Sequence, residues 1–233
     1  MRKELAETGH VKKHRKLIEI VEQEFSHDPG HTMDHVMRVF NNACQIAISE
    51  PDLEMDVLET AVLLHDIARI KEDRDTTGTV DHALLGAEDA VPILRELGYP
   101  EEKIEKIKHC IQTHRYRSGY NPETMEAKIL FDADKLDLLG AVGIARMYMF
   151  AGEYHQDMYS FTPLGEYIQD NLAGGKPGCR IKNIEKHSPN LEFELKIRNI
   201  PDRLYTKKAK EMAGFKIKFM EDFFDQIRKN ILE

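Results

Sequence analysis

Residues 61–68 read Ala61-Val-Leu-Leu-His-Asp-Ile-Ala68, an apolar stretch that contains one histidine followed directly by one aspartate. Apolar residues recur around it at helical spacing, which predicts a helix that begins near Pro51-Asp52 and carries His65 and Ala68 on its buried side. A buried histidine and a buried carboxylate lose their hydration, and a divalent metal ion would compensate that loss. The dyad His65-Asp66 therefore indicates a metal site.

Two further residues that bind metals in proteins lie on predicted apolar helix faces. His35 stands in line with Ile46 on one helix. Asp134 shares another with Phe131, and Asn121-Pro-Glu123 is a typical start for that helix. A single histidine on a helix stripe is more often a hydrogen-bonded core residue, but carboxylates are rarely buried without a partner, so the joint pattern outweighs that reading. The predicted metal ligands are His35, His65, Asp66 and Asp134.

This donor set indicates which ion is bound and what the ion does. Two imidazoles and two carboxylates fill four positions of an octahedral ion, and imidazole favours transition metals. We expect Mn²⁺ or Fe²⁺ first, with Co²⁺, Ni²⁺, Zn²⁺ or Mg²⁺ as alternatives, and His31 as a candidate further ligand. Such an ion activates water and polarises a phosphoryl oxygen, which predicts hydrolysis of a phosphoester or phosphoanhydride.

Helical spacing continues through the first two thirds of the chain. Further helices are expected at about 80–97 and 101–116, on either side of Gly98-Tyr-Pro100. The polar segment from Lys71 to Thr79 follows the dyad and is expected to be a loop at which substrate enters the site.

The chain changes character after about residue 151. Asn171 to Pro189 is rich in Gly, Pro and Lys and favours a loop, and Leu191 to Ile197 alternates weakly, as a short strand would. An amphipathic helix is expected from about Asp202. The sequence predicts an all-α protein with one domain, residues 1–233, that comprises a metal-site core at about 20–150, an irregular insertion at about 152–200 and a C-terminal helix at about 202–231.

Composition limits the partners. The 233 residues are 41% hydrophobic, enough for a real core, and 41 acidic residues against 33 basic ones argue against a general nucleic-acid or anionic-membrane surface. A small anionic ligand is the better expectation. No continuous apolar segment of the kind that signal peptides or membrane spans need is evident, so a cytoplasmic location is expected. Cys44, Cys110 and Cys179 form no Cys-x-x-Cys pair, and reduced thiols are expected.

Several cations are candidates for holding a substrate phosphate. Lys135 follows Asp134 directly and is the strongest candidate. Arg38 lies about one helical turn after His35, and Arg115 and Arg117 form a further basic pair.

The pattern resembles the HD-domain superfamily of metal-dependent phosphohydrolases over about residues 20–150. The family's first histidine falls on His35, its HD dyad on His65-Asp66, and its distal aspartate on Asp134 of Ala133-Asp-Lys-Leu136. The resemblance implies a helical HD bundle that hydrolyses a nucleotide or a related small phosphate compound. In some triphosphohydrolase members a lysine after the distal aspartate touches phosphate, which is the role implied for Lys135.

The chain also departs from the family pattern. Several members place a glutamate three residues after the dyad's aspartate as an acid or base, whereas this chain has Arg69 there. His82 matches a family histidine that faces substrate or a second metal, and His114 is the more promising pocket residue of the pair His109 and His114. We therefore predict two sets of site residues. The catalytic set is Asp66, His82 and Lys135, and the substrate-binding set is Arg38, Lys135, His114 and Arg115.

Two rival functions stay open. The missing glutamate is compatible with a non-catalytic module that senses a nucleotide through the same metal pocket. A di-iron oxygenase, as in some distant HD relatives, would need more ligands, of which His82 and His114 could supply two. The expected partner in the main hypothesis is a small phosphorylated substrate such as a nucleotide, with no nucleic acid and no membrane, and a homo-oligomer is an open alternative to a monomer.

Overall fold

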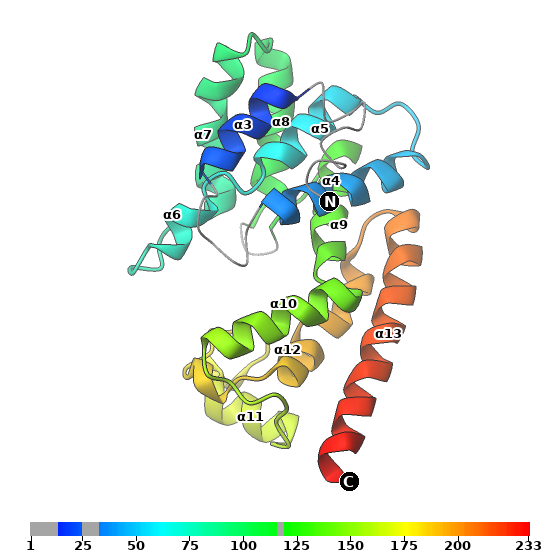
Figure 1. Cartoon of the computed structure of the whole chain (residues 1–233). Helices are drawn as coiled ribbons and strands as arrows, with labels where there is room; N and C mark the ends of the chain where they lie inside the picture. Colours follow the sequence, from blue (N-terminus) through cyan, green and yellow to red (C-terminus); the bar gives the residue numbers. More distant parts are fainter. Residues whose placement is uncertain (1–13, 25–32, 116–118) are drawn as a thin grey trace. The chain divides into compact units, whose positions relative to one another are not determined.

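The structure, a computed structural model, describes residues 14–24, 33–115 and 119–233. The chain divides into two compact units, Met1–Asp134 and Lys135–Glu233. Among the described residues the regular elements are helices, apart from one isolated bridge between Leu172 and Ile181, so the predicted all-α class is confirmed (Figure 1). The single domain predicted for residues 1–233 stays a prediction, and each unit is described by itself.

The first unit is organised around one buried helix. Its elements are α3 (Arg15–Glu24), α4 (Met33–Ala47), α5 (Met55–Leu64), α6 (Arg69–Asp73), α7 (His82–Glu96), α8 (Glu101–Thr113) and most of α9 (Met125–Asp137). Helix α5 packs against α3, α4 and α8, and all its residues from Val57 to Leu64 are buried. The buried carboxylate of Glu59 pairs with the His14 ring at 2.8 Å, which compensates its desolvation.

Both ends of α5 differ from the prediction. The helix begins at Met55 rather than near Pro51, because Asp52 adopts a φ of 57°, which no helix accommodates. The helix ends at Leu64 rather than continuing through Ala68. Tight turns follow, and in one of them the Arg69 amide donates a hydrogen bond to the Asp66 carbonyl at 2.8 Å. In a continuous helix, consecutive side chains diverge by about 100°. The tighter turns let both members of the dyad face the same region.

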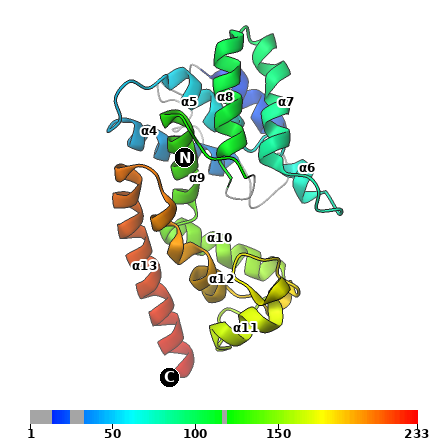
Figure 2. The same ribbon diagram turned by 180° about the vertical axis from the view of Figure 1, so that it is seen from behind.

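Helices α7 and α8 pack side by side and bring two helix ends toward the dyad (Figure 2). The Asp81 carboxylate accepts the Ala83 amide at 2.9 Å and caps α7, so His82 becomes its first residue. Helix α8 ends at Thr113, and His114 follows at its C-terminus. The loop predicted from Lys71 to Thr79 is helical at its beginning, since α6 extends to Asp73, and is a turn beyond it.

Helix α9 begins at Met125, four residues after the predicted start at Asn121. Its predicted apolar face is buried, including Leu130 and Phe131. The Asn42 side-chain amide donates to the Ala133 carbonyl at 3.2 Å and fixes α9 against α4. This contact places Asp134 next to the helix that carries His35.

The second unit has its core where α10 contacts α12 and α13. The predicted strand at Leu191 to Ile197 is wrong: Pro189–Leu195 is helix α12, with proline in its first turn. Leu191 and Phe193 are both buried, and Phe193 stacks on Phe224 at 4.9 Å, so the alternation reflects a short buried helix. The elements are α10 (Gly140–Glu153), α11 (Leu164–Asn171), η1 (Ala173–Gly175), η2 (Ile184–Lys186), α12, η3 (Ile197–Asn199), η4 (Pro201–Arg203) and α13 (Lys207–Leu232).

The last helix begins five residues later than predicted from Asp202. Pro201–Arg203 forms the separate 3-10 turn η4, and Thr206 caps α13 by accepting the Ala209 amide at 3.2 Å. The segment of about 152–200, predicted to be irregular, contains helices α11 and α12, and the Gly- and Pro-rich residues between these helices include the short 3-10 turns η1 and η2.

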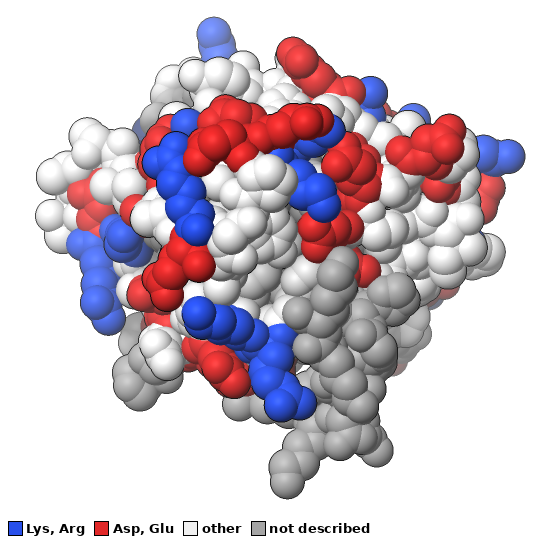
Figure 3. All heavy atoms as spheres, turned by 90° about the horizontal axis from the view of Figure 1, so that it is seen from above, with Lys and Arg blue, Asp and Glu red and all other residues white. Residues whose placement is uncertain are grey.

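No described helix combines the length and hydropathy required of a membrane span. On the face seen in Figure 3, basic and acidic side chains are interspersed rather than separated by sign.

Candidate metal centre

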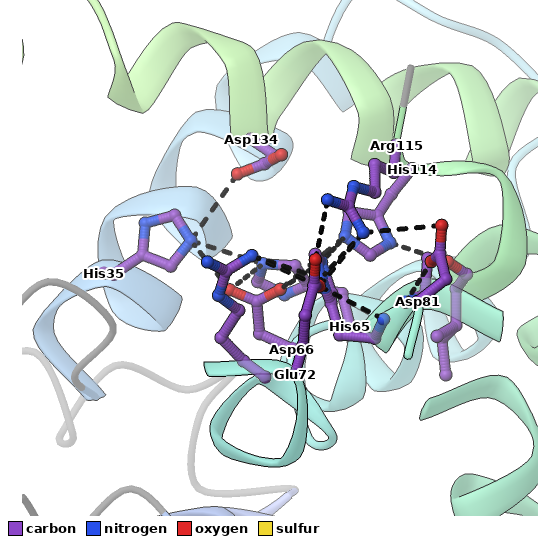
Figure 4. Close-up of polar contacts among 12 residues, drawn as sticks. His35, His65, Asp66, Glu72, Asp81, His114, Arg115 and Asp134 are labelled. Atoms are coloured by element: carbon purple, nitrogen blue, oxygen red, sulfur yellow. Dashed lines mark hydrogen bonds and ion pairs between the residues drawn. The ribbon is translucent and has the colours of Figure 1, made fainter. Parts of the chain in front are cut away.

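The structure brings the four predicted ligands together from helices α4 and α9 and from the turn after α5 (Figure 4). The His35 Nε2 atom lies 3.5 Å from Asp66 Oδ2 and 3.5 Å from Asp134 Oδ1. The His65 Nε2 atom lies 3.4 Å from His35 Nε2 and 3.6 Å from Asp66 Oδ2. His35, His65 and Asp66 are buried, and they form one of the two described groups whose atoms are close enough to share a metal ion.

Backbone carbonyls fix the orientation of two of the histidines. His65 Nδ1 lies 2.7 Å from the Val62 carbonyl, and His114 Nδ1 lies 2.6 Å from the Ile111 carbonyl. A carbonyl can only accept, so each Nδ1 carries the proton and donates it. The Nε2 atom of each neutral ring is left with a lone pair that faces the site, which is the form in which histidine binds metals.

A second group of ligands lies on the other side of Asp66. His82 Nε2 is 3.2 Å and His114 Nε2 is 3.6 Å from Asp66 Oδ1, and the two histidine atoms are 3.1 Å apart. Asp66 thus turns Oδ2 toward His35 and His65 and Oδ1 toward His82 and His114. Asp66 therefore belongs to both groups of residues that would hold a metal ion.

The donor atoms fit an ion that lies between them. Two ligands bound to one ion at about 2.1 Å lie about 3.0–3.4 Å from each other, close to the separations in both groups. His114 donates from Nδ1 to a carbonyl and His82 faces the Glu72 carboxylate with its Nδ1, so their two Nε2 atoms confront each other as acceptors. Two acceptors at this distance repel unless a metal ion or a proton lies between them.

The electrostatics keep the first group in metal-binding protonation states. Burial lowers the pKa of His65 to about 4, although the charge of Asp66 opposes this. Burial alone would raise the pKa of Asp66, but His65 and the hydrogen bonds to the other histidines outweigh it and hold that pKa well below its usual value. Neutral imidazole and ionised carboxylate are the forms that coordinate a metal.

His82 differs from the other ligands. Burial would lower the pKa of its ring, but hydrogen bonds with Asp66 and Glu72 outweigh burial and raise it. His82 therefore takes up an extra proton more readily than His65 when no ion is present, and metal binding would displace that proton.

Known proteins share the fold of this chain, and one family model matches part of it. Residues 32–139 match the family model described as HD domain. A crystal structure described as a HD-superfamily hydrolase from Bacillus thuringiensis aligns with 95% of this chain and 97% of that chain, at 26% identity and a TM-score of 0.68. The chain belongs to the HD-domain superfamily. The comparisons support a metal-dependent HD hydrolase as its general class.

Two further relatives of this HD protein are described with a bound ligand or with an activity of their own. Bacillus subtilis YpgQ, described as uncharacterized, is 28% identical over 206 residues, which are 87% of this chain and 85% of YpgQ. The crystal structure of YpgQ in complex with ADP has a TM-score of 0.68 and covers 96% of this chain and 97% of that chain. YhaM of Bacillus pumilus, described as a 3′-5′ exoribonuclease, is 27% identical over 63% of this chain, and the match covers 54% of YhaM.

One residue of the HD centre, Glu72, received no role from the sequence, where His82 was preferred. Glu72 in α6 hydrogen-bonds His82 Nδ1 through Oε2, and Arg115 donates to Glu72 Oε1 at 2.8 Å and Oε2 at 3.0 Å. Burial would raise the pKa of Glu72, but the hydrogen bonds from His82 and Arg115 lower it to about 2. The available signal was spacing: Glu72 lies three residues after Arg69, and therefore on the same helix face as the position where many HD relatives carry glutamate.

Arg115, which the sequence assigned to substrate phosphate, is paired with protein carboxylates. Besides Glu72, its guanidinium lies 3.4 Å from Asp81 Oδ2. Arg69 likewise reaches Glu72 Oε2 at 3.4 Å and Asp73 Oδ1 at 2.7 Å.

The other predicted phosphate ligands lie next to the first ligand group in sequence. Arg38 is half-buried in α4, three residues after His35, and Lys135 is buried in α9 directly after Asp134. Their roles stay predictions. His31 and Arg117 lie outside the described residues.

Proposed function

We propose that this HD protein is a metal-dependent phosphohydrolase that cleaves a phosphoester or phosphoanhydride bond of a nucleotide or related small phosphate compound. The observation that carries the proposal is the buried group of His35, His65 and Asp66, in which His65 Nε2 lies 3.4 Å from His35 Nε2 and 3.6 Å from Asp66 Oδ2, within reach of one ion. This arrangement favours a divalent cation, and open positions on that cation serve hydrolysis.

The residues of the centre would have separate roles in metal binding and in substrate binding. His35, His65, Asp66 and Asp134 would hold the ion, with Mn²⁺ or Fe²⁺ preferred because nitrogen and oxygen donors are mixed. When bound, the ion activates water and polarises the phosphoryl oxygen. The ionised Asp66 has Oδ2 near His35 and His65 and Oδ1 near His82 and His114, so its charge would serve both groups. The expected role of Lys135 is to neutralise the substrate phosphate.

The relatives favour a nucleotide as the phosphate compound. YpgQ, which aligns with nearly the whole chain, has been crystallised with ADP, and YhaM, about half of which this chain spans, is described as an exoribonuclease. A nucleoside phosphate is the chemistry these two proteins share. The full-length similarity to YpgQ favours a free nucleotide over an RNA strand as the substrate of this chain.

The proposal is tested by metal analysis coupled to a release assay. Protein loaded with Mn²⁺ or Fe²⁺ is incubated with nucleoside mono-, di- and triphosphates and with a single-stranded RNA, and phosphate, pyrophosphate and nucleotides are measured. We expect phosphate or pyrophosphate release from a free nucleotide, lost together with bound metal in Asp66→Ala and Asp134→Ala. Asp89→Ala is the matched control, because Asp89 pairs with Lys71 at the surface of α7.

The results that overturn the proposal are specific. Full turnover in Asp66→Ala would exclude the metal centre as the catalytic site. Cleavage of RNA without cleavage of any free nucleotide would replace the substrate class. Nucleotide binding by the loaded protein without release of any product would favour the non-catalytic sensor.

A di-iron oxygenase is the second candidate, because the structure supplies the ligands that the sequence alone left uncertain. His82 and His114 join Asp66 in a second group, so two irons have enough donors. Oxygen uptake by the iron-loaded protein in the presence of a candidate substrate, absent with Mn²⁺, would favour this function over hydrolysis.

A further inference from the structure

Glu72 contacts a histidine of the HD centre whose Nδ1 faces a side-chain carboxylate rather than a backbone carbonyl. His65 and His114 each donate from Nδ1 to a carbonyl three residues earlier in the chain. His82 is the first residue of α7, where the preceding residues are not helical, and its Nδ1 is met by a carboxylate from α6 instead. We propose that Glu72 is a positioning residue that fixes the His82 tautomer and thereby determines whether the second ligand group binds an ion.

Glu72 fixes both the ring and the backbone of His82. Its Oε2 accepts the hydrogen bond at His82 Nδ1, and the same oxygen lies 3.3 Å from the His82 amide, which donates to it. With the Nδ1 proton donated to Glu72, Nε2 is the atom of His82 that is left to bind an ion, and it lies 3.2 Å from Asp66 Oδ1 and 3.1 Å from His114 Nε2. A carboxylate at the far nitrogen also makes the imidazole a stronger metal ligand than a neutral carbonyl does.

Two arginines hold the Glu72 carboxylate in place. Arg115 contacts both of its oxygens, and Arg69 contacts Oε2 at 3.4 Å. Arg115 directly follows His114 at the end of α8 and also pairs with Asp81, the capping residue of α7. The Arg115–Glu72 pair thus joins the end of α8 to the start of α7. The two histidines of the second group are held relative to each other by this ion pair.

The first ligand group has a different anchor. His65 is fixed by the Val62 carbonyl within its own chain segment, and the first group lies at Asp66 Oδ2, whereas His82 lies at Asp66 Oδ1. Loss of Glu72 should therefore weaken the second group selectively. The inference rests on the proposed metal centre, but it does not depend on which reaction the centre performs.

The test counts bound ions rather than turnover. Metal-free wild-type protein and variants are titrated with Mn²⁺, and bound Mn²⁺ is quantified from the loss of the free-ion electron paramagnetic resonance signal. We expect two ions per wild-type chain. In Glu72→Ala the second ion should bind about 10–100-fold more weakly while the first keeps its affinity. Glu72→Gln, whose amide oxygen still accepts the Nδ1 proton but carries no charge, should lie between the two.

Asp73→Asn is the matched control, because Asp73 is the neighbouring acid of α6 and pairs with Arg69. It should bind two ions as the wild type does. A second measurement addresses the tautomer directly. Nitrogen-15 spectra of the histidine rings of metal-free protein at alkaline pH should show the Nδ1-protonated form of His82 in the wild type and a mixture of tautomers in Glu72→Ala.

Each alternative result decides against the inference. Two ions bound at wild-type affinity in Glu72→Ala, or an unchanged His82 tautomer, would remove the role of Glu72. A single ion per wild-type chain at saturating Mn²⁺ would remove the second site itself, and equal weakening of both ions would make Glu72 a support of the whole centre. If Glu72→Ala does not fold, the same criteria apply to the isosteric Glu72→Gln. Absence of phosphate release would contradict only the proposed function, because neither measurement involves a substrate.

Discussion

The Nε2 atoms of His82 and His114 lie 3.1 Å apart, and the Nδ1 atom of each ring faces an acceptor. Neutral rings held in this way present two lone pairs to each other. A bound cation, or in its absence a proton on His82, must lie between these lone pairs, and this connects ion binding to stability.

Metal binding should raise the melting temperature, and Asp66 should be required for this increase. Mn²⁺ at about 100 times its dissociation constant stabilises a one-site protein by about 2.7 kcal/mol. Thermal unfolding of metal-free protein with and without Mn²⁺ measures the effect. Asp66→Asn should show no increase, because Asp66 contributes to both ligand groups, and Asp89→Asn should behave as the wild type. An equal increase in Asp66→Asn would contradict the assignment.

Lys135→Ala should impair use of a phosphate substrate without releasing the metal. A hydrogen bond to a charged group contributes about 1.5–3 kcal/mol, which corresponds to a decrease in kcat/KM of about 10–100-fold. Steady-state kinetics and metal analysis of the same samples separate the two effects. Lys207→Ala is the control, since that side chain is 91% exposed. Unchanged kinetics in Lys135→Ala would remove its predicted role.

Glu192 should contribute to the pH dependence of stability. Burial would raise the pKa of this carboxyl, but Lys196 and His187 outweigh burial and lower it to about 2, from 4.5. A depressed folded-state pKa stabilises the protein above the unfolded value, and the contribution is lost as pH falls from 4.5 to about 2. Denaturant unfolding across that range should show a shallower loss in Glu192→Gln. Glu194→Gln, beside it in α12, should retain the wild-type slope, and identical slopes in both variants would contradict the expectation.

Among the three cysteines, Cys179 should be the fast-reacting thiol. Cys179 is exposed, whereas Cys110 is buried and Cys44 is partly buried. Burial raises the pKa of Cys110 to about 12 and, together with the charge of Glu59, that of Cys44 to about 11, so little thiolate forms at neutral pH. Ellman's reagent should titrate one thiol rapidly in the native protein, and Cys179→Ser should abolish that phase. A rapid phase that persists in Cys179→Ser would show that a buried thiol is accessible.

Phe193→Ala should strongly destabilise the second unit. The ring is buried, stacks on Phe224 at 4.9 Å, and carries the Arg198 guanidinium 5.0 Å above its centre. Removing such a side chain costs about 3–5 kcal/mol. Phe215→Ala is the matched control, because Phe215 on α13 is 84% exposed and should change stability little. Denaturant unfolding measures both variants, and similar losses in the two would contradict the packing.

The helices were predictable from periodicity, and the starts of α7 and α8 agree with the predicted ones, but those of α5 and α9 do not. Apolar residues at helical spacing located α4, α5, α7, α8 and α9 because burial of one face dominates helix formation in a protein core. Pro51 and Asn121 resemble helix starts, yet α5 and α9 each begin four residues later. The left-handed φ of Asp52 shows why: a turn, set by tertiary packing, uses the same residue types as a cap.

The candidate site, too, was only partly predictable from the sequence. The proximity of His35, His65, Asp66 and Asp134 could be predicted because three of them fall on apolar helix faces and Asp66 adjoins His65, which is visible in the sequence alone. The pairing of Glu72 with Arg115 could not be predicted, because the two residues are 43 positions apart and glutamate and arginine most often lie at the protein surface. Only the folded contact gives them a role beside His82.

All four histidines of the centre lie at helix ends. His35 is in the first turn of α4, His82 opens α7, and His65 and His114 follow the last residues of α5 and α8. The first and last turns of helices lack part of their internal hydrogen bonding and fray first when a protein opens locally. Ions bound to these rings would connect the four helix ends. Metal binding would therefore also suppress local unfolding at those ends.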